Sequence, residues 1–467
     1  MQIKVASCNT LIVLLLILSS LYCVRAFSAP LKTLSLFDGK HRSTDWISVE
    51  GSHRVRYQAL NSQFRSGRSG SDQALSLRTT ILTKFNLEDF NLVVEGIDSR
   101  VYLDDRGTPL NSTMVNAFDL LQAYAEIKTK RWVPRGESSL KLGRFTIDAG
   151  SRRLVARNKF RNTINSFTGL EWNWKLNKNE KLQIFFTLPV QRMPTSANRL
   201  DSNSLFVDRE YPEIKFWGLY YYLDYLPLSL AGEVYIVGLH ENDGDDIETR
   251  NSGLYTPGFR IYRKRPGKGF DYLLEVAFQF GEKRQTSNPI DERDLDHFAH
   301  FEHFELGYNF ENSFSTRISF EFDYASGDRK SNNGESGRFE TLFGARRFDF
   351  GPTGIFGPFA RANTLSPGVR MNMKFTEELT LMAAFRSYWL ASKHDSWVKA
   401  NLRDPEGESG PFLGHQLEAR LRYNPLFAKY RFEFGVACLD EGRYRQNFTN
   451  SKNTNSLYGY GQISFNF

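Results

Sequence analysis

The chain has 467 residues, with 60 Lys or Arg and 53 Asp or Glu, and its formal net charge at pH 7 is +7. This excess is small for a chain of this length, so charge gives no argument for nucleic-acid binding. Aromatic residues make up 14% of the chain, a heavy load for a surface that faces only water, although the mean hydropathy of -0.45 is typical of soluble proteins.

The first predicted element is a secretory signal peptide over residues 1–26. Lys4 precedes an apolar run from Leu11 to Leu21, and Ala26 provides the small residue that cleavage needs. Cleavage removes Lys4 and Arg25 and no acid, so the net charge of the mature chain, residues 27–467, is +5. After this segment, no apolar run approaches the roughly 18 residues of a membrane-spanning helix.

Cysteine usage indicates a bacterial envelope protein. Cys8 and Cys23 leave with the signal peptide, and Cys438 remains, so no intramolecular disulfide can form. Cys23 follows Tyr22, where a lipoprotein signal has a small residue, and this argues against lipidation. An exported chain of this length without a disulfide is ordinary for bacterial envelope proteins and uncommon among soluble eukaryotic secreted domains.

Most of the mature chain alternates between apolar and polar residues with a period of two, which predicts β-strands. In SFSTRISFEFDY, for example, Phe320 and Phe322 share one face, and Arg317, Glu321 and Asp323 share the other. No segment has a convincing amphipathic helical pattern. The predicted strands in chain order are 48–59, 74–85, 90–101, 118–128, 166–175, 181–188, 215–224, 228–239, 269–280, 313–324, 379–389, 414–423, 429–437 and 461–467.

Two all-β architectures fit this pattern. In a soluble sandwich the apolar faces would form a core, whereas in a transmembrane barrel they face lipid and the charged faces line a water-filled lumen. Strands of about nine to twelve residues with charged polar faces favour the barrel, because backbone groups in lipid must all be paired. The chain also ends on an aromatic strand, with Ile463 and Phe465 in step with Phe467, which resembles the C-terminal signal of bacterial outer-membrane proteins.

Chain length predicts the size of the barrel. The 441 residues after residue 26, at about 24 residues per strand with its connection, give an even number of strands near 18. A barrel of that size is too wide for side chains to fill and encloses a channel. We therefore expect an all-β, transmembrane, antiparallel β-barrel of about 18 strands, monomeric, that spans the Gram-negative cell outer membrane.

Two segments carry a family resemblance. LKLGRFTIDAGSRRLVARNKFRNTINSFTGLEW, residues 140–172, and YASGDRKSNNGESGRFETLFGARRFDFGPTGIFGPFARANTLSPG, residues 324–368, resemble blocks of the alginate export family of outer-membrane porins. A further match is RTTILTKFNLEDFNLVVEGIDSR with DLLQAYAEIK downstream. The resemblance implies an 18-stranded barrel with an electropositive lumen that passes an anionic polysaccharide such as alginate.

Arginines are the candidate substrate-path residues, because guanidinium groups exchange carboxylates by forked contacts and rings of Arg or Lys select anions in pores. For any one arginine, the alternative is a structural pair with a lumen acid such as Glu95, Asp98, Asp119 or Glu126. The candidates are Arg144, Arg152, Arg153, Arg157 and Arg161 in the first block, Arg346, Arg347 and Arg361 in the second, and Arg78, Arg370 and Arg386 on strands.

A long irregular segment, near residues 325–367, is rich in glycine and proline and therefore is no regular transmembrane strand. We expect it to be a loop folded into the pore or a lid. Phenylalanines at 343, 348, 350, 356 and 359 would anchor it, and its arginines would stay open to water and substrate. The alternative is an external loop that packs for stability and takes no part in transport.

Other functions fit the sequence less well. His297, His300 and His303 are spaced by three, but on a strand His300 takes the opposite face, so no metal site is expected, and we expect no cofactor. No GxSxG-like element or catalytic group is found, so we expect a channel and no enzyme. The alternatives are a porin for small organic anions or oligosaccharides and, less favoured, a barrel enzyme. The expected partners are an anionic polysaccharide or oligosaccharide, outer-membrane lipid and periplasmic export proteins, with no nucleic acid.

Overall fold

The computed structural model describes residues 46–330, 333–426, 429–449 and 455–467. Residues Ile47–Phe467 form one compact unit. The predicted signal peptide lies outside the described residues, so its cleavage site stays a prediction.

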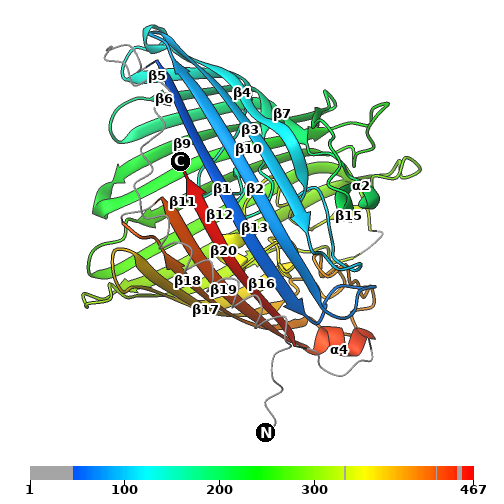
Figure 1. The fold of residues 1–467 in the computed structure, drawn as a ribbon. Coiled ribbons are helices and arrows are strands. Elements are labelled where there is room, and N and C mark those ends of the chain that lie inside the picture. Colours follow the sequence, from blue (N-terminus) through cyan, green and yellow to red (C-terminus); the bar gives the residue numbers. More distant parts are fainter. Residues whose placement is uncertain (1–45, 331–332, 427–428, 450–454) are drawn as a thin grey trace. The chain divides into compact units, whose positions relative to one another are not determined.

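The described residues form a closed antiparallel barrel of 18 long strands (Figure 1). Each long strand pairs with its neighbours along the chain, and the last pairs with the first, which closes the ring. Two further strands of two residues each, β8 and β15, pair with β7 and β13. The strands are β1 (Ile47–Asn61), β2 (Asp72–Asn86), β3 (Phe90–Tyr102), β4 (Asn116–Lys128), β5 (Glu137–Phe145), β6 (Phe167–Lys175), β7 (Glu180–Gln191), β8 (Arg209–Glu210), β9 (Ile214–Leu226), β10 (Leu230–Glu241), β11 (Gly253–Arg263), β12 (Gly269–Arg284), β13 (Asp294–Asn309), β14 (Arg317–Ala325), β15 (Glu335–Ser336), β16 (Thr364–Lys374), β17 (Leu379–Trp389), β18 (Phe412–Tyr423), β19 (Tyr430–Glu441) and β20 (Ser456–Asn466).

The polarity of the barrel is the reverse of that of a soluble protein. In β14, Ile318 and Phe320 on the outer face are 41% and 44% exposed, whereas Arg317, Glu321 and Asp323 on the inner face are at most 4% exposed. An apolar outer face and a charged interior match a barrel that lies in lipid and encloses water. The expected alternation and strand number are confirmed.

The two ends of the barrel differ in their connections. At one end, short turns such as residues 87–89 and 375–378 join the strands; we call this the short-turn end. At the long-loop end the connections are longer, and α2 (Ala197–Asp201) and α4 (Arg443–Thr449) lie there (Figure 1). The other helices are α3 (Arg347–Phe350), η2 (Lys130–Trp132) and η3 (Pro227–Ser229). Among the described residues, no helix has the length and apolar character needed to cross a membrane.

The barrel closes where β20 pairs with β1. Gly51 and Phe467 exchange two backbone hydrogen bonds, each 3.0 Å between nitrogen and oxygen. The ring of Phe467 occupies the space where a side chain at position 51 would lie, so glycine at this position leaves room for the terminal aromatic residue. The predicted terminal strand thus pairs with the strand that begins the barrel.

Four long strands have no counterpart among the predicted ranges: β5, β11, β13 and β16. Two of them contain proline, which lacks a backbone donor. The register of β16 with β17 skips Pro367, and that of β11 with β12 skips Pro257, so both strands tolerate proline where the ladder is interrupted. The end of the predicted irregular segment at residue 367 is therefore wrong: the connection between β14 and β16 covers residues 326–363.

Candidate functional site

Two long connections fold into the lumen and contact each other. We call residues 146–166, between β5 and β6, the first inner loop, and residues 326–363, between β14 and β16, the second inner loop. Val155 and Phe343 form a parallel bridge, and the amide of Ala345 donates to the carbonyl of Arg152 at 2.9 Å. A Cβ on Gly344 would overlap the carbonyl oxygen of Arg153, so this close approach requires glycine.

Arginines of the barrel wall hold the first inner loop by its backbone. Arg54 of β1 donates to the carbonyls of Lys159, Phe160 and Arg161 at 2.9–3.1 Å. Arg78 of β2 donates to two of the same carbonyls at 3.0 Å. These carbonyls are neutral partners, so neither guanidinium group is paired with an acid through these contacts.

A buried ion-pair junction joins the two inner loops. Arg153 of the first loop contacts Asp349 of the second at 2.9 Å and Glu275 of β12 at 2.8 Å, and Arg361 pairs with the same Asp349. Burial acts to raise the pKa of Asp349, but Arg153 and Arg361 hold it well below its usual range. Arg361 is 1% exposed, so the expectation that its guanidinium is open to water is wrong.

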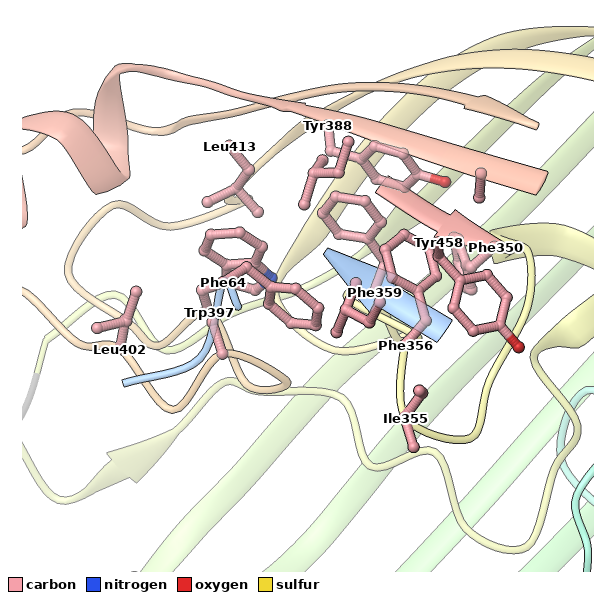
Figure 2. Packing of buried hydrophobic residues seen from close by; sticks show 14 of the residues in the cluster. Phe64, Phe350, Ile355, Phe356, Phe359, Tyr388, Trp397, Leu402, Leu413 and Tyr458 are labelled. Carbon is pink, nitrogen blue, oxygen red and sulfur yellow. The ribbon is translucent and has the colours of Figure 1, made fainter. Parts of the chain in front are cut away.

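Aromatic side chains anchor the second inner loop to the barrel wall and to other loops. Phe359 and Phe356 of this loop pack against Trp397, Tyr458 and Phe64, which lie in three other parts of the chain (Figure 2). The stacked rings of Phe356 and Tyr458 have centroids 5.0 Å apart. At the other end of the loop, the Phe343 ring packs against Phe167 and Phe216 of β6 and β9. The predicted anchoring role is confirmed for Phe343, Phe356 and Phe359.

The inner loops and the wall enclose a cavity of about 1130 Å³ towards the short-turn end. Its lining includes Gly51, Asn466 and Phe467, which places it beside the strand closure described above. Eleven cationic and four acidic side chains line it, which gives a formal excess of seven positive charges. The cations are Arg54, Arg56, Arg78, Arg152, Arg157, Lys159, Arg347, Arg420, Arg422, Lys429 and Arg431, and the acids are Glu50, Glu95, Asp148 and Glu433.

Most of these cations lack an acidic partner. Three form ion pairs: Arg157 with Glu95 and Arg347 with Glu418, both at 2.6 Å, and Arg422 with Glu433. The other eight have no ion pair within the described part of the chain. Burial acts to lower the pKa of Arg347, but Glu418 raises it, so this guanidinium stays charged. The cavity therefore has a large positive potential that an anion can neutralise.

Of the eleven arginines predicted from sequence, four line this cavity: Arg78, Arg152, Arg157 and Arg347. The others lie elsewhere, most of them in ion pairs, so their part in a substrate path stays a prediction. Arg153 and Arg361 pair with Asp349, Arg144 with Glu210, Arg370 with Glu321, and Arg386 with Glu321 and Asp323, while Arg161 and Arg346 lie on the other side of the inner loops, outside the cavity lining.

Sequence reasoning missed the wall cations of β1 and β18. Arg54 and Arg56 stand two residues apart in β1, and Arg420 and Arg422 stand two apart in β18. Two arginines at this spacing share one face of a strand, so the pattern was a usable signal for a lumen-facing pair.

Two of the predicted lumen acids, Glu95 and Asp98, lie on opposite faces of β3. Glu95 faces the lumen as expected, but Asp98 lies on the outer face with Val94 and pairs with Arg100 at 2.9 Å, so its assignment as a lumen acid is wrong. A register shift between Glu95 and Gly96 marks an irregularity in the pairing of β3 with β4.

Three inward groups, His303, Asp323 and Asp349, lie close enough to hold a metal ion. His303 contacts Asp323 at 2.8 Å, Arg386 also pairs with Asp323, and Arg153 with Asp349. Since guanidinium groups already neutralise both carboxylates, we interpret this group as part of the ion-pair junction. The predicted alternation of the histidines is confirmed: His303 is buried and His300 lies on the outer face.

A closed barrel of this strand number, with lipid outside and a charged lumen, defines an outer-membrane channel. The chain belongs to the alginate export family, whose model matches residues 45–458. The sequence resemblance to this family is thereby confirmed.

Solved structures of the same fold include OccAB2 of Acinetobacter baumannii, 12% identical, with a TM-score of 0.59 and coverage of 90% of this chain and 98% of that one. OccK3 (OpdO) of Pseudomonas aeruginosa is 13% identical, with a TM-score of 0.54 and coverage of 90% and 96%. OpdK of the same organism, solved with vanillate, is 11% identical, with a TM-score of 0.56 and coverage of 90% and 98%. At these identities the similarity concerns the fold. No curated protein matches the chain.

Proposed function

We propose that the protein passes an anionic polysaccharide such as alginate, or its oligosaccharides, across the Gram-negative outer membrane through the cationic cavity. The observation that carries this proposal is the excess of seven positive charges around a cavity of about 1130 Å³. Family membership supports the substrate class, because the family is described as alginate export.

The chemistry of the cavity suits a polymer with a carboxylate on every sugar. Each guanidinium makes forked contacts with one carboxylate and releases it to the next, provided that no fixed acid competes. Arg152 and Arg420 form no ion pair in the described structure, and Arg56 contacts the neutral amide of Gln462 at 2.6 Å. A row of such groups attracts the chain without one deep binding site that would stop its movement.

Outer-membrane barrels have short turns on the periplasmic side and longer loops outside. In this orientation the cavity opens towards the periplasm, where a polymer awaiting export would meet it. Proteins that deliver the polymer would approach the short-turn end. We propose a transport role without catalysis.

Reversal potentials across planar bilayers test this function. In a salt gradient, the wild-type channel is expected to conduct anions in preference to cations, because the cavity attracts anions. The double variant Arg152→Ser and Arg420→Ser removes two cations without acidic partners and should reduce anion selectivity severalfold. Uronate oligomers should also slow the current of small anions less in this variant.

A matched control is Arg106→Ser, because Arg106 is exposed in the connection between β3 and β4, outside the cavity lining. This variant should keep the selectivity of the wild type. Cation preference in the wild-type channel would rule out the proposed function.

The second candidate is a porin for small organic anions. OpdK, which shares the fold, was solved with vanillate, and the same arginines would attract a small carboxylate. The two candidates differ in how block depends on length: a polymer channel is blocked progressively more by longer uronate oligomers, whereas a monomer porin binds a single uronate as well as it binds a tetramer.

A further inference from the structure

A second group of cations lies on the side of the inner loops that faces the long-loop end, opposite the cavity. Arg65, Arg161, Arg346 and Lys399 come from four different connections between strands, and each side chain is half-buried. None of the four forms an ion pair with a carboxylate in the parts of the chain that the structure describes. We call these four residues the upper cation cluster.

Hydrogen bonds fix the side chains of Arg65 and Arg346 in this cluster. Arg65 donates from Nη1 and Nη2 to two carbonyls of the segment 355–359, at 2.8 and 2.6 Å. Arg346 donates from Nη1 to two further carbonyls of the same segment, at 3.2 and 2.6 Å. The amide of Ser66 donates to the carbonyl of Ala400 at 2.8 Å, which brings the connection that carries Lys399 beside Arg65. The guanidinium groups of Arg65 and Arg346 thus both bind the segment 355–359, and their partners are uncharged backbone carbonyls.

The cluster is distinct from the cavity at the short-turn end. Arg347 lines that cavity, and its neighbour Arg346 does not; likewise Phe160 lines it, and Arg161 does not. The inner loops therefore carry cations on two faces, one towards the cavity and the other towards the long-loop end.

Mutual repulsion in the cluster is strong. The charge of Arg346, then burial, then Arg161 and Arg65 lower the pKa of Lys399 to about 7, against a small opposite effect of Glu340. Burial, then Arg161, Arg65 and Arg361, also lower the pKa of Arg346, to about 9. Lys399 therefore titrates near neutral pH.

We propose that Arg65, Arg161, Arg346 and Lys399 form a second anion-binding station, which takes a carboxylate of the substrate on the long-loop side of the inner loops and takes up a proton as it binds. The ligand class rests on the proposed function. A bound carboxylate favours the charged form of Lys399, so binding is tightest below about pH 7 and weakens as the pH rises. If the ligand raises the pKa of the lysine by one unit, affinity falls by up to about tenfold between the two pH limits.

The test uses the full-length barrel in planar bilayers, with tetragalacturonate added on the long-loop side at pH 6 and at pH 8.5. We expect wild-type block to be several-fold stronger at pH 6. Lys399→Gln should give equally weak block at both pH values, because it removes the titrating charge. Lys399→Arg should retain most of its block at pH 8.5, because an arginine whose pKa is lowered to about 9, as that of Arg346 is, remains mostly charged at that pH.

Lys393→Gln is the matched control, because Lys393 is an exposed lysine of the same connection outside the cluster, and it should keep the pH dependence of the wild type. Heat-modifiable migration shows that each variant is folded. The proposed second site is overturned if wild-type block is independent of pH, or if Lys399→Arg loses as much block at pH 8.5 as the wild type does. If anion selectivity and block from the short-turn side persist in that case, the proposed function stands; if the wild-type channel prefers cations, the proposed function itself fails.

Discussion

At the scale of single residues, Asp349 has the largest structural role that we identify in the lumen. Its carboxylate binds Arg153 of the first inner loop and Arg361 of the second, and all three side chains are buried. Removal of one partner from a buried ion pair usually costs about 3–5 kcal/mol, because the remaining charge is left uncompensated.

We therefore expect Asp349→Asn to loosen both inner loops without opening the barrel. Its single-channel current should fluctuate more than that of the wild type, and proteases should cut the inner loops more readily. Glu311→Gln is the control: Glu311 lies in a turn and its pair with Lys268 is mostly exposed to water, so the loss should be about 0–1 kcal/mol. If the single-channel current of Asp349→Asn fluctuates no more than that of the wild type, the ion-pair junction does not hold the inner loops.

The same junction predicts how the channel responds to acid. A carboxylate with a depressed pKa stabilises the folded state above the pKa of the unfolded chain, and that stability is lost as the pH falls through the lower, folded value. Because the pKa of Asp349 lies well below 3.8, the inner loops should stay anchored at pH 5. Current fluctuations of the wild-type channel should accordingly be the same at pH 5 and pH 8.

At the scale of elements, the two inner loops act as one unit, because backbone hydrogen bonds join them at Gly344. In Gly344→Ala the new methyl group would overlap the carbonyl of Arg153, so the loops must separate. We expect a cost of about 1–3 kcal/mol, typical of overpacking, and a measurable change in single-channel conductance.

The control for this variant is Gly267→Ala, at a short turn where an added methyl group meets no atom within 4 Å. Its conductance should match that of the wild type, and its effect on stability should stay within about 0.5 kcal/mol. Equal conductance in both variants would mean that the contact between the loops does not shape the channel.

The second inner loop also shows what the sequence could predict at this scale. Its irregular course and its anchoring phenylalanines follow from its composition. The different roles of Arg346 and Arg347 do not, because they depend on which wall groups face each side of the loop. Arg347 meets Glu418 of β18, some 70 residues away in sequence, and no local pattern indicates that pair.

At the scale of the whole molecule, the strand number and the reversed polarity could be predicted from length and alternation. β11 and β16 could not be located individually, because Pro257 and Pro367 interrupt the pattern that identifies a strand. The cationic lumen was foreseeable, yet its members were only partly identified. Arg370 and Arg386 have the sequence pattern expected of pore residues, but both form ion pairs with Glu321 in the barrel wall.

The architecture predicts the behaviour of the intact protein. The mature chain, expected to begin at Phe27, should fractionate with the outer membrane, and the unheated detergent extract should migrate faster than the boiled sample, because a closed barrel resists detergent. The measurements are gel mobility with and without heating and N-terminal sequencing. Recovery in the soluble periplasmic fraction would contradict the predicted location.

The pairing of β1 with β20 has a consequence for biogenesis. The strand that emerges first from the ribosome has to wait for a partner more than 400 residues later, and until that partner arrives two rows of unpaired amides and carbonyls remain open. Lipid cannot hydrate those groups, so a half-built sheet has no stable place in the bilayer. Insertion is therefore expected to be nearly all-or-none, and deletion of β20, which leaves both β1 and β19 without a partner, should act as an assembly defect: the chain would be made and exported but would accumulate unfolded.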